Sequence, residues 1–214
     1  MEGLPRSAAT LGGVTRLFLV RHGETDWNRT GRLQGTSEVP LNDAGRAQVK
    51  ASAALLATRL HAQPTVVSSP LSRARETAHA IADVVGVPVL IDDRLIERAY
   101  GVWEGLNFEE REARDPVQNQ VWRERREPAI EGYEGHTLVA ERMKAAVADW
   151  MPRTTGDLVF VTHGSASRML VESLLGLPTG GHTIGNLGNA AWSLLVPVTD
   201  GPWSLVQHNA GADA

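Results

Sequence analysis

The sequence predicts an α/β fold in which helices cover both faces of a mainly parallel sheet. Short apolar runs of β-favouring residues alternate with longer segments of helical composition, and this alternation is typical of parallel strands joined by crossover helices. Several apolar runs end at a polar, glycine-containing turn, which is where open α/β sheets place their ligands. With 214 residues, of which 42% are hydrophobic, the chain is long enough to bury a substantial core.

The individual elements are predicted from apolar runs and from helix-ending signals. Strands are expected over residues 16–20, 65–68, 87–91 and 158–162, with further strand-like runs over residues 190–197 and 203–208. Helices are expected over residues 42–60, 72–85, 137–150 and 165–175. Gly86 and Pro88 end the second of these helices, and a turn at Asp200-Gly201-Pro202 separates the last two runs.

Two segments differ from this alternating pattern. Residues 1–14 hold scattered small and polar residues, which predict a flexible N-terminal tail. Residues 107–136 contain thirteen Asp, Glu, Lys or Arg side chains among thirty residues and are interrupted by two prolines. This composition fits a solvated helical excursion, and it fits equally a cap that overhangs a site and selects the substrate. We therefore expect a single domain over residues 15–210 with a charged, cap-like insertion around residues 107–136.

The composition argues against several classes of function. A net charge of −4 gives no sign of the basic surface typical of nucleic-acid-binding proteins. The absence of cysteine excludes disulfides, thiol catalysis and Cys-ligated metals. No stretch reaches the roughly 20 apolar residues of a membrane span, and residues 1–14 lack the apolar run of about 7–15 residues found in secretory signals. We expect a soluble, cytoplasmic protein without nucleic-acid or membrane partners.

Arginine and histidine side chains follow the ends of three predicted strands. Arg21 and His22 come directly after the first strand, and His163 and Gly164 come directly after the fourth. Arg73 lies in the first turn of the helix that follows the second strand. Because such strand ends lie along one edge of a parallel sheet, we expect these residues to share a site. The helix that follows the fourth strand would direct its N-terminal amides to the same place.

This set of side chains is typical of phosphate chemistry. Arginine offers a planar fork that matches phosphate oxygens, and neutral histidine offers a nitrogen nucleophile near pH 7. Paired histidines also suit a metal ion. However, none of the seven histidines has a His-x-x-x-His or His-x-His partner with a nearby carboxylate, and an adjacent arginine repels a divalent cation. We therefore predict no metal and no cofactor.

Several segments together resemble the motifs of one enzyme family. They are Arg21-His22-Gly23-Glu24-Thr25-x-Trp27-Asn28, Gly31-Arg32-Leu33-Gln34-Gly35, Pro40-Leu41-Asn42 with Gly45, residues 68–78, and Val161-Thr162-His163-Gly164. The pattern resembles the histidine phosphatase superfamily, the phosphoglycerate-mutase-like clan. This resemblance implies a three-layer α/β/α sandwich. It also implies a metal-independent phosphomonoesterase for small phosphorylated metabolites, with phosphoglycerate and sugar phosphates among the candidate substrates.

The resemblance further implies a role for each residue of the site. His22 is the expected nucleophile, which carries the phosphoryl group as a phosphohistidine. The rest of the expected phosphate pocket consists of Arg21, Arg73 and His163, with Asn28 and the backbone of Gly164 as further donors. Phosphoryl transfer needs this kind of charge stabilisation around the transferred oxygens, and the positive charge of the arginines should favour the neutral form of His22.

The family also uses a carboxylic acid as proton donor, for which the sequence offers three candidates. The resemblance assigns the role to Glu97, which lies a few residues past the end of the third predicted strand. Glu104, beside Trp103, can equally be a structural carboxylate. Glu134 belongs to Gly132-Tyr133-Glu134-Gly135-His136-Thr137, an altered form of the family's Gly-Gly-Glu-Ser element, and could close over the pocket.

Two alternative functions stay open at this point. A cofactor-dependent phosphoglycerate mutase is one, because Gly105-Leu106-Asn107 resembles that branch, although Thr25 and the short middle segment fit the phosphatase branch. A catalytically silent binding protein on the same fold is the other, and the complete set of site residues argues against it. Residues 185–192 resemble enzymes that act on phosphoglycerate-type sugar acids, and a general monoester phosphatase that acts on several metabolites stays equally open. The leaving group and the oligomeric state stay open, with a homodimer as one option.

Overall fold

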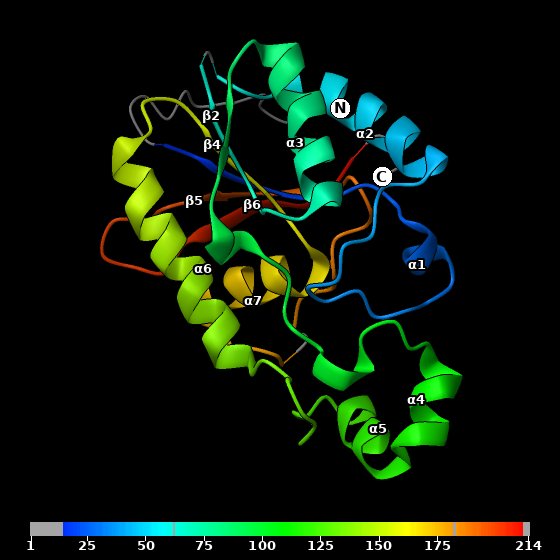
Figure 1. Cartoon of the computed structure of the whole chain (residues 1–214). Helices are drawn as coiled ribbons and strands as arrows, with labels where there is room; N and C mark the ends of the chain where they lie inside the picture. Colours follow the sequence, from blue (N-terminus) through cyan, green and yellow to red (C-terminus); the bar gives the residue numbers. More distant parts are fainter. Residues whose placement is uncertain (1–14, 62, 182, 212–214) are drawn as a thin grey trace, which may run out of the picture.

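The computed structural model describes residues 15–61, 63–181 and 183–211 (Figure 1), so the tail predicted over residues 1–14 lies outside the described residues. Its central sheet has six strands in the order β3-β2-β4-β1-β5-β6. The strands are β1 (Leu17–Arg21), β2 (Thr65–Ser68), β3 (Val89–Ile91), β4 (Leu158–Thr162), β5 (Trp192–Val196) and β6 (Ser204–Ala210). The four strands β1 to β4 are parallel, whereas β5 and β6 join the sheet in antiparallel pairs.

Helices cover both faces of this sheet, as the α/β prediction requires (Figure 1). One face is covered by α2 (Asp43–Ala57) and α3 (Ser72–Val85), and the other by α6 (His136–Trp150) and α7 (Gly164–Leu174). In β1, Phe18 and Val20 pack into the core cluster on the α2–α3 side, whereas Leu17 and Leu19 pack into the cluster on the α6–α7 side. Because successive side chains point to opposite faces, a strand buried on both sides is apolar throughout. The predicted three-layer α/β/α sandwich is confirmed.

The predicted element boundaries differ from the structure by a few residues. The helix expected over residues 42–60 starts after Asn42, whose side-chain oxygen accepts the N–H of Gly45 at 2.8 Å, and it ends at Ala57. The strand expected over residues 87–91 is shortened to β3, an edge strand. The end of α3 is as predicted, because Gly86 adopts the left-handed conformation, with φ of 71°, that terminates helices.

The charged segment over residues 107–136 contains two short helices that project away from the sheet (Figure 1). They are α4 (Phe108–Arg114) and α5 (Pro116–Arg123). The fully buried Trp103 contacts this segment, because its indole N–H donates to Asp115 at 2.8 Å. The guanidinium of Arg111 lies 4.7 Å from the ring centroid of Trp122. Aromatic and cation–π contacts thus contribute to the order of this charged segment.

Short helical segments complete the described chain. They are α1 (Asp26–Arg29) and the 3₁₀ turns η1 (Asp93–Leu95), η2 (Gly101–Trp103) and η3 (Met151–Arg153), none of which the apolar pattern predicted. No helix within the described ranges has the length and apolar character needed to cross a membrane.

Candidate active site

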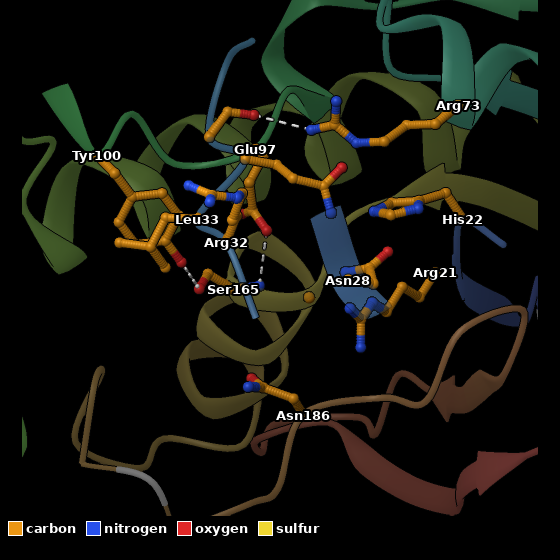
Figure 2. A pocket seen from close by; sticks show the side chains of 13 residues that line it. Arg21, His22, Asn28, Arg32, Leu33, Arg73, Glu97, Tyr100, Ser165 and Asn186 are labelled. Atoms are coloured by element: carbon orange, nitrogen blue, oxygen red, sulfur yellow. Dashed lines mark hydrogen bonds between the residues drawn. The ribbon is translucent and has the colours of Figure 1, made fainter. Parts of the chain in front are cut away.

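The carboxyl ends of the parallel strands bring Arg21, His22 and Arg73 together around one cavity (Figure 2). Asn28, Glu97 and Gly164 also line this cavity, whereas His163 is not among its lining residues. Arg21 is the last residue of β1, and His22 follows it directly. His163 is the N-cap residue of α7, directly after β4. Arg73 lies in the first turn of α3, a few residues after the end of β2. The cavity volume is about 130 Å³, well below the roughly 300–1,000 Å³ of drug-sized ligand sites. The enclosed part therefore fits a phosphate group rather than a whole large substrate.

His22 is held as a neutral imidazole with one nitrogen free. The side chain is 3% exposed, and its Nδ1 lies 2.7 Å from the carbonyl oxygen of Gly23. Because a carbonyl can only accept, Nδ1 carries the proton, and the lone pair lies on Nε2. Burial, reinforced by the charges of Arg73 and Arg21, holds the pKa of His22 well below its ordinary range. A nucleophilic nitrogen is thus available at neutral pH.

His163 lies beside His22 and is fully buried, with 5.2 Å between the two ring centroids. Its Nε2 is 2.8 Å from Oγ of Ser69, and its buried Nδ1 has no hydrogen-bond partner among the described residues. Burial first, and then the charge of Arg73, lowers the pKa of His163 well below its ordinary value. A buried ring nitrogen without a partner is costly, which is consistent with a ligand that supplies the missing partner.

The two arginines are anchored through some of their N–H groups and keep others unpaired. Arg73 donates from Nη1 to the carbonyl of Ser37 and from Nη2 to that of Gly35, both at 2.8 Å. Arg21 donates from Nη1 to the carbonyl of Leu187 at 2.6 Å. Both guanidinium groups line the cavity, and the buried Nε of each lacks a partner among the described residues. Rigid, charged donors with free N–H groups are what an anionic group needs.

The amide of Asn28 is oriented by its neighbours. Its Oδ1 accepts hydrogen bonds from the backbone N–H of Thr25 and from Nδ2 of Asn189, each at 3.1 Å. Because the oxygen is occupied in this way, the Nδ2 group is the part of the amide left to donate to a ligand. Asn28 lines the cavity beside His22 (Figure 2), so this donor adds to those of the arginines.

Glu97 lies at the N-terminus of α7 and lines the cavity. Its carboxylate accepts the backbone N–H groups of Ser165 at 3.0 Å and Ala166 at 2.9 Å, and that of Arg98 at 2.8 Å. Two amides that could have bound an anion are therefore occupied by this side chain. The first N–H of the helix, that of Gly164, has no acceptor within the helix and borders the cavity.

Glu104 and Glu134 have other partners. Glu104 accepts the N–H of Thr36 at 3.0 Å, the hydroxyl of Ser37 at 2.6 Å and the N–H of Tyr100 at 3.1 Å. Glu134 forms an ion pair with Arg142 at 2.8 Å. Of the three candidate acids, Glu97 is the one that lines the cavity.

Further cavity residues were not singled out from the sequence. They are Arg32, Leu33, Gln34, Gly35, Tyr100, Ser165 and Asn186. Residues 31–35 belong to a segment that resembles a family motif, and Asn186 falls within residues 185–192. The sequence thus carries a signal for five of these positions but assigns them no role. The hydroxyls of Tyr100 and Ser165 are joined by a hydrogen bond of 2.7 Å (Figure 2). Within the described part of the chain, no group of three His, Asp or Glu side chains is arranged to hold a metal ion.

Comparison with known families agrees with this geometry. The sequence model described as histidine phosphatase superfamily (branch 1) matches residues 17–211. The chain belongs to the histidine phosphatase superfamily. The match begins at β1, which presents Arg21 and His22, and ends just beyond β6.

Individual members of the superfamily resemble the chain over most of its length. A glucosyl-3-phosphoglycerate phosphatase from Mycolicibacterium vanbaalenii is 38% identical, over 93% of this chain and 96% of that protein. A probable phosphoglycerate mutase from Yersinia enterocolitica is 35% identical, over 89% of this chain and 88% of that protein. The structure of a mycobacterial glucosyl-3-phosphoglycerate phosphatase with VO3 has a TM-score of 0.79 and 34% identity, over 92% of this chain and 100% of that chain. The predicted family and the predicted enzyme class, a phosphatase, are confirmed.

Proposed function

We propose that this phosphatase hydrolyses phosphate monoesters of small sugar-acid metabolites through a phosphoryl group carried on Nε2 of His22. The observation that carries the proposal is the hydrogen bond from Nδ1 of His22 to the carbonyl of Gly23 at 2.7 Å, since it leaves Nε2 unprotonated inside a pocket of unpaired arginine N–H groups. Relatives named glucosyl-3-phosphoglycerate phosphatase support the class of substrate. No metal ion or cofactor takes part in the proposed steps.

The first half-reaction transfers the phosphoryl group to the enzyme. Arg21 and Arg73 bind the phosphate oxygens, assisted by the donors of Asn28, His163 and Gly164. Nε2 of His22 attacks phosphorus in line, and the bond between phosphorus and the ester oxygen breaks. The proton for the departing oxygen comes from the carboxyl group of Glu97, which lines the same cavity. Fixed donors around the transferred group supply most of the stabilisation in reactions of this kind.

The second half-reaction returns the enzyme to its starting state. Glu97, now a carboxylate, takes a proton from a water molecule, and the oxygen of that water attacks phosphorus in the phosphohistidine. The phosphorus–nitrogen bond breaks, inorganic phosphate leaves, and His22 regains its neutral form. The same carboxyl group thus acts first as acid and then as base.

The segment over residues 107–136 is proposed to act as a cap that contributes to substrate choice. Arg32 lines the cavity and donates from Nη1 and Nη2 to Glu110 of α4, at 2.6 and 3.0 Å. This ion pair links the rim of the cavity directly to the cap. The single domain over residues 15–210, the cytoplasmic location, the homodimer and the lack of nucleic-acid and membrane partners remain predictions from the sequence.

The covalent intermediate provides the test of the mechanism. Phosphohistidine is labile in acid and stable in base, whereas phosphoserine is stable in acid. Rapid quenching with labelled substrate, in the presence of a strong chelator, should trap base-stable label in the native protein and none in His22→Ala. Label that persists in His22→Ala would place the nucleophile elsewhere, with His163 the first residue to examine. Loss of activity on chelation that added divalent metal restores would overturn the metal-independent mechanism.

The mutase alternative is separated by the fate of the phosphoryl group. Incubation with 3-phosphoglycerate and a bisphosphoglycerate primer should release inorganic phosphate rather than interconvert the 2- and 3-isomers. Isomerisation that is faster than phosphate release would favour the mutase. One relative is named a probable phosphoglycerate mutase, so the measurement decides between two functions found among similar proteins.

A further inference from the structure

The backbone that carries Glu97 is bound by one arginine of α6. Arg142 donates from Nη1 to the carbonyl oxygens of Arg94 and Ile96, each at 2.7 Å, and from Nη2 to that of Glu97 at 3.2 Å. After the single turn of η1, this stretch belongs to no helix or strand. Its carbonyl groups therefore need partners from elsewhere in the molecule. Arg142 supplies a partner for those of Ile96 and Glu97, and also for that of Arg94 within η1.

The other N–H groups of Arg142 bind Glu134. The contacts run from Nε to Oε1 at 2.8 Å and from Nη2 to Oε2 at 3.0 Å. Glu134 also binds the residues after Glu97, because its N–H donates to the carbonyl of Ala99 at 2.9 Å and its carboxylate accepts the N–H of Ala99 at 3.3 Å. The two side chains are 18% and 22% exposed, so solvent screens this pair less than a surface pair.

A second set of backbone contacts holds the same two segments together. Tyr100 and Tyr133 form an antiparallel bridge, and the N–H of Val102 donates to the carbonyl of Glu131 at 3.1 Å. Gly101 makes this approach possible, since a Cβ there would lie 1.9 Å from the Glu131 oxygen. The altered Gly132-Tyr133-Glu134-Gly135 element thus runs alongside the stretch that follows Glu97 and delivers Glu134 to it.

We propose that the Arg142–Glu134 pair is a positioning device that sets the acid Glu97 at the distance from the leaving group that proton transfer requires. This inference rests on the proposed function, in which Glu97 is the acid. The pair touches neither the cavity nor its proposed ligand, and it acts through the backbone of residues 94–99. Proton transfer between misplaced groups is slow, and a displacement of about 1 Å can cost on the order of 10²-fold in rate. Lysine cannot replace Arg142, because it lacks the planar fork that reaches three carbonyls and a carboxylate together.

The test compares substrates with good and poor leaving groups. A general acid matters most for an alkyl phosphate and least for nitrophenyl phosphate, where it is hardly needed. Glu134→Gln and Arg142→Lys should lower kcat for an alkyl phosphate about ten-fold or more beyond any loss on nitrophenyl phosphate. When either change is combined with Glu97→Gln, the ratio of the two rates should show no additional change, since the acid is already absent.

Arg16→Lys is the matched control. Arg16 forms an ion pair of 2.6 Å with the buried Asp157, and it lies at the amino ends of β1 and β4, opposite the cavity. This variant should lower the melting temperature and leave the rate ratio unchanged. Circular dichroism shows which variants are folded, and the isosteric Glu134→Gln change decides the matter if Arg142→Lys does not fold.

The outcomes distinguish a failure of the assignment of Glu97 as the acid from a failure of the positioning role alone. If Glu97→Gln leaves the ratio unchanged, the assignment of the acid fails, and the positioning role fails with it. If Glu97→Gln changes the ratio but folded Glu134→Gln slows both substrates equally, the positioning role alone is overturned. A further change in the ratio when Glu134→Gln is added to Glu97→Gln would also overturn it.

Discussion

His22 and His163 lie side by side in the interior, with 5.2 Å between their ring centroids and an angle of 58° between the ring planes. Both are at most 3% exposed. Burial, with the charge of Arg73 as the next cause, lowers the pKa of each well below the ordinary value. Two adjacent imidazoles among arginines are thus kept neutral. Nε2 of His22 carries no proton that must be removed before it attacks phosphorus. The positive charge that binds phosphate therefore comes from the arginines alone.

This arrangement predicts how stability depends on pH. In the unfolded chain these histidines take up protons as the pH falls below about 6.5, whereas in the folded protein they do not. The unfolded state then binds more protons, so the free energy of unfolding must fall as the pH falls from about 6.5. His136 adds to the effect, because burial lowers its pKa to about 4. Each histidine should contribute up to about 1.4 kcal/mol per pH unit.

Denaturant unfolding between pH 7.5 and about 5 measures this slope. Glutamine is neutral at every pH in this window, so the His22→Gln variant loses the uptake of up to one proton on unfolding. The slope of its free energy of unfolding against pH should therefore be smaller by up to about 1.4 kcal/mol per pH unit. Stability that is constant over the window in the native protein would show that the buried histidines take up protons while folded.

Asn28→Asp should abolish most of the activity without unfolding the protein. The new carboxylate keeps the acceptor for Thr25 and Asn189 but replaces the free donor with a negatively charged oxygen that faces the phosphate. Loss of a fixed donor costs about 10²–10³-fold in rate in comparable sites, and kcat/KM should fall at least this far. Asn107→Asp is the control, because it makes the same change at the N-cap of α4, where aspartate caps equally well. A small effect of Asn28→Asp would remove Asn28 from the phosphate pocket.

Glu110→Gln should change substrate preference if the cap contacts the leaving group. The change weakens the link between Arg32 and α4, and ion pairs that are exposed in part contribute only weakly. KM for a phosphorylated sugar acid should therefore rise by a few fold, with KM for nitrophenyl phosphate unchanged. Glu76→Gln is the control. Glu76 forms an ion pair with Arg46 at 2.7 Å on the α2–α3 side, and the exposure of this pair is similar to that of Arg32 and Glu110. Equal changes for both substrates would argue against substrate selection by the cap.

The parts of the fold that sequence patterns predict well are those with local signals. β2, α3 and β4 have the predicted boundaries, because apolar runs and the left-handed Gly86 mark them. The strand order could not be predicted, since it depends on which helix packs on which face. The position of β1 between β4 and β5 is set by contacts between distant residues and not by any local pattern.

The site, like the fold, combines features with local sequence signals and features that depend on contacts between distant residues. Arg21, His22, Arg73 and His163 were predictable, because each follows a strand end and parallel strand ends lie along one edge. The tautomer of His22 and the ion pair between Arg142 and Glu134 could not be predicted from the sequence. Both depend on one hydrogen-bonding atom meeting another, and residue types spaced along a chain do not encode such contacts. The sequence therefore predicts which side chains share the site, and only the structure shows which of their atoms are free to react.

Glu97 and Glu104 provide the sharpest contrast between an acid and a structural carboxylate. Both bind backbone N–H groups, but Glu97 lines the cavity, whereas Glu104 binds Thr36, Ser37 and Tyr100. Glu97→Gln should lower the rate on alkyl phosphates by about 10²–10⁴-fold and affect nitrophenyl phosphate far less. Glu104→Gln should lower stability by roughly 1–3 kcal/mol, because it weakens hydrogen bonds to a charged group, and it should slow both substrates equally. If Glu104→Gln shows the leaving-group dependence and Glu97→Gln does not, the acid is Glu104.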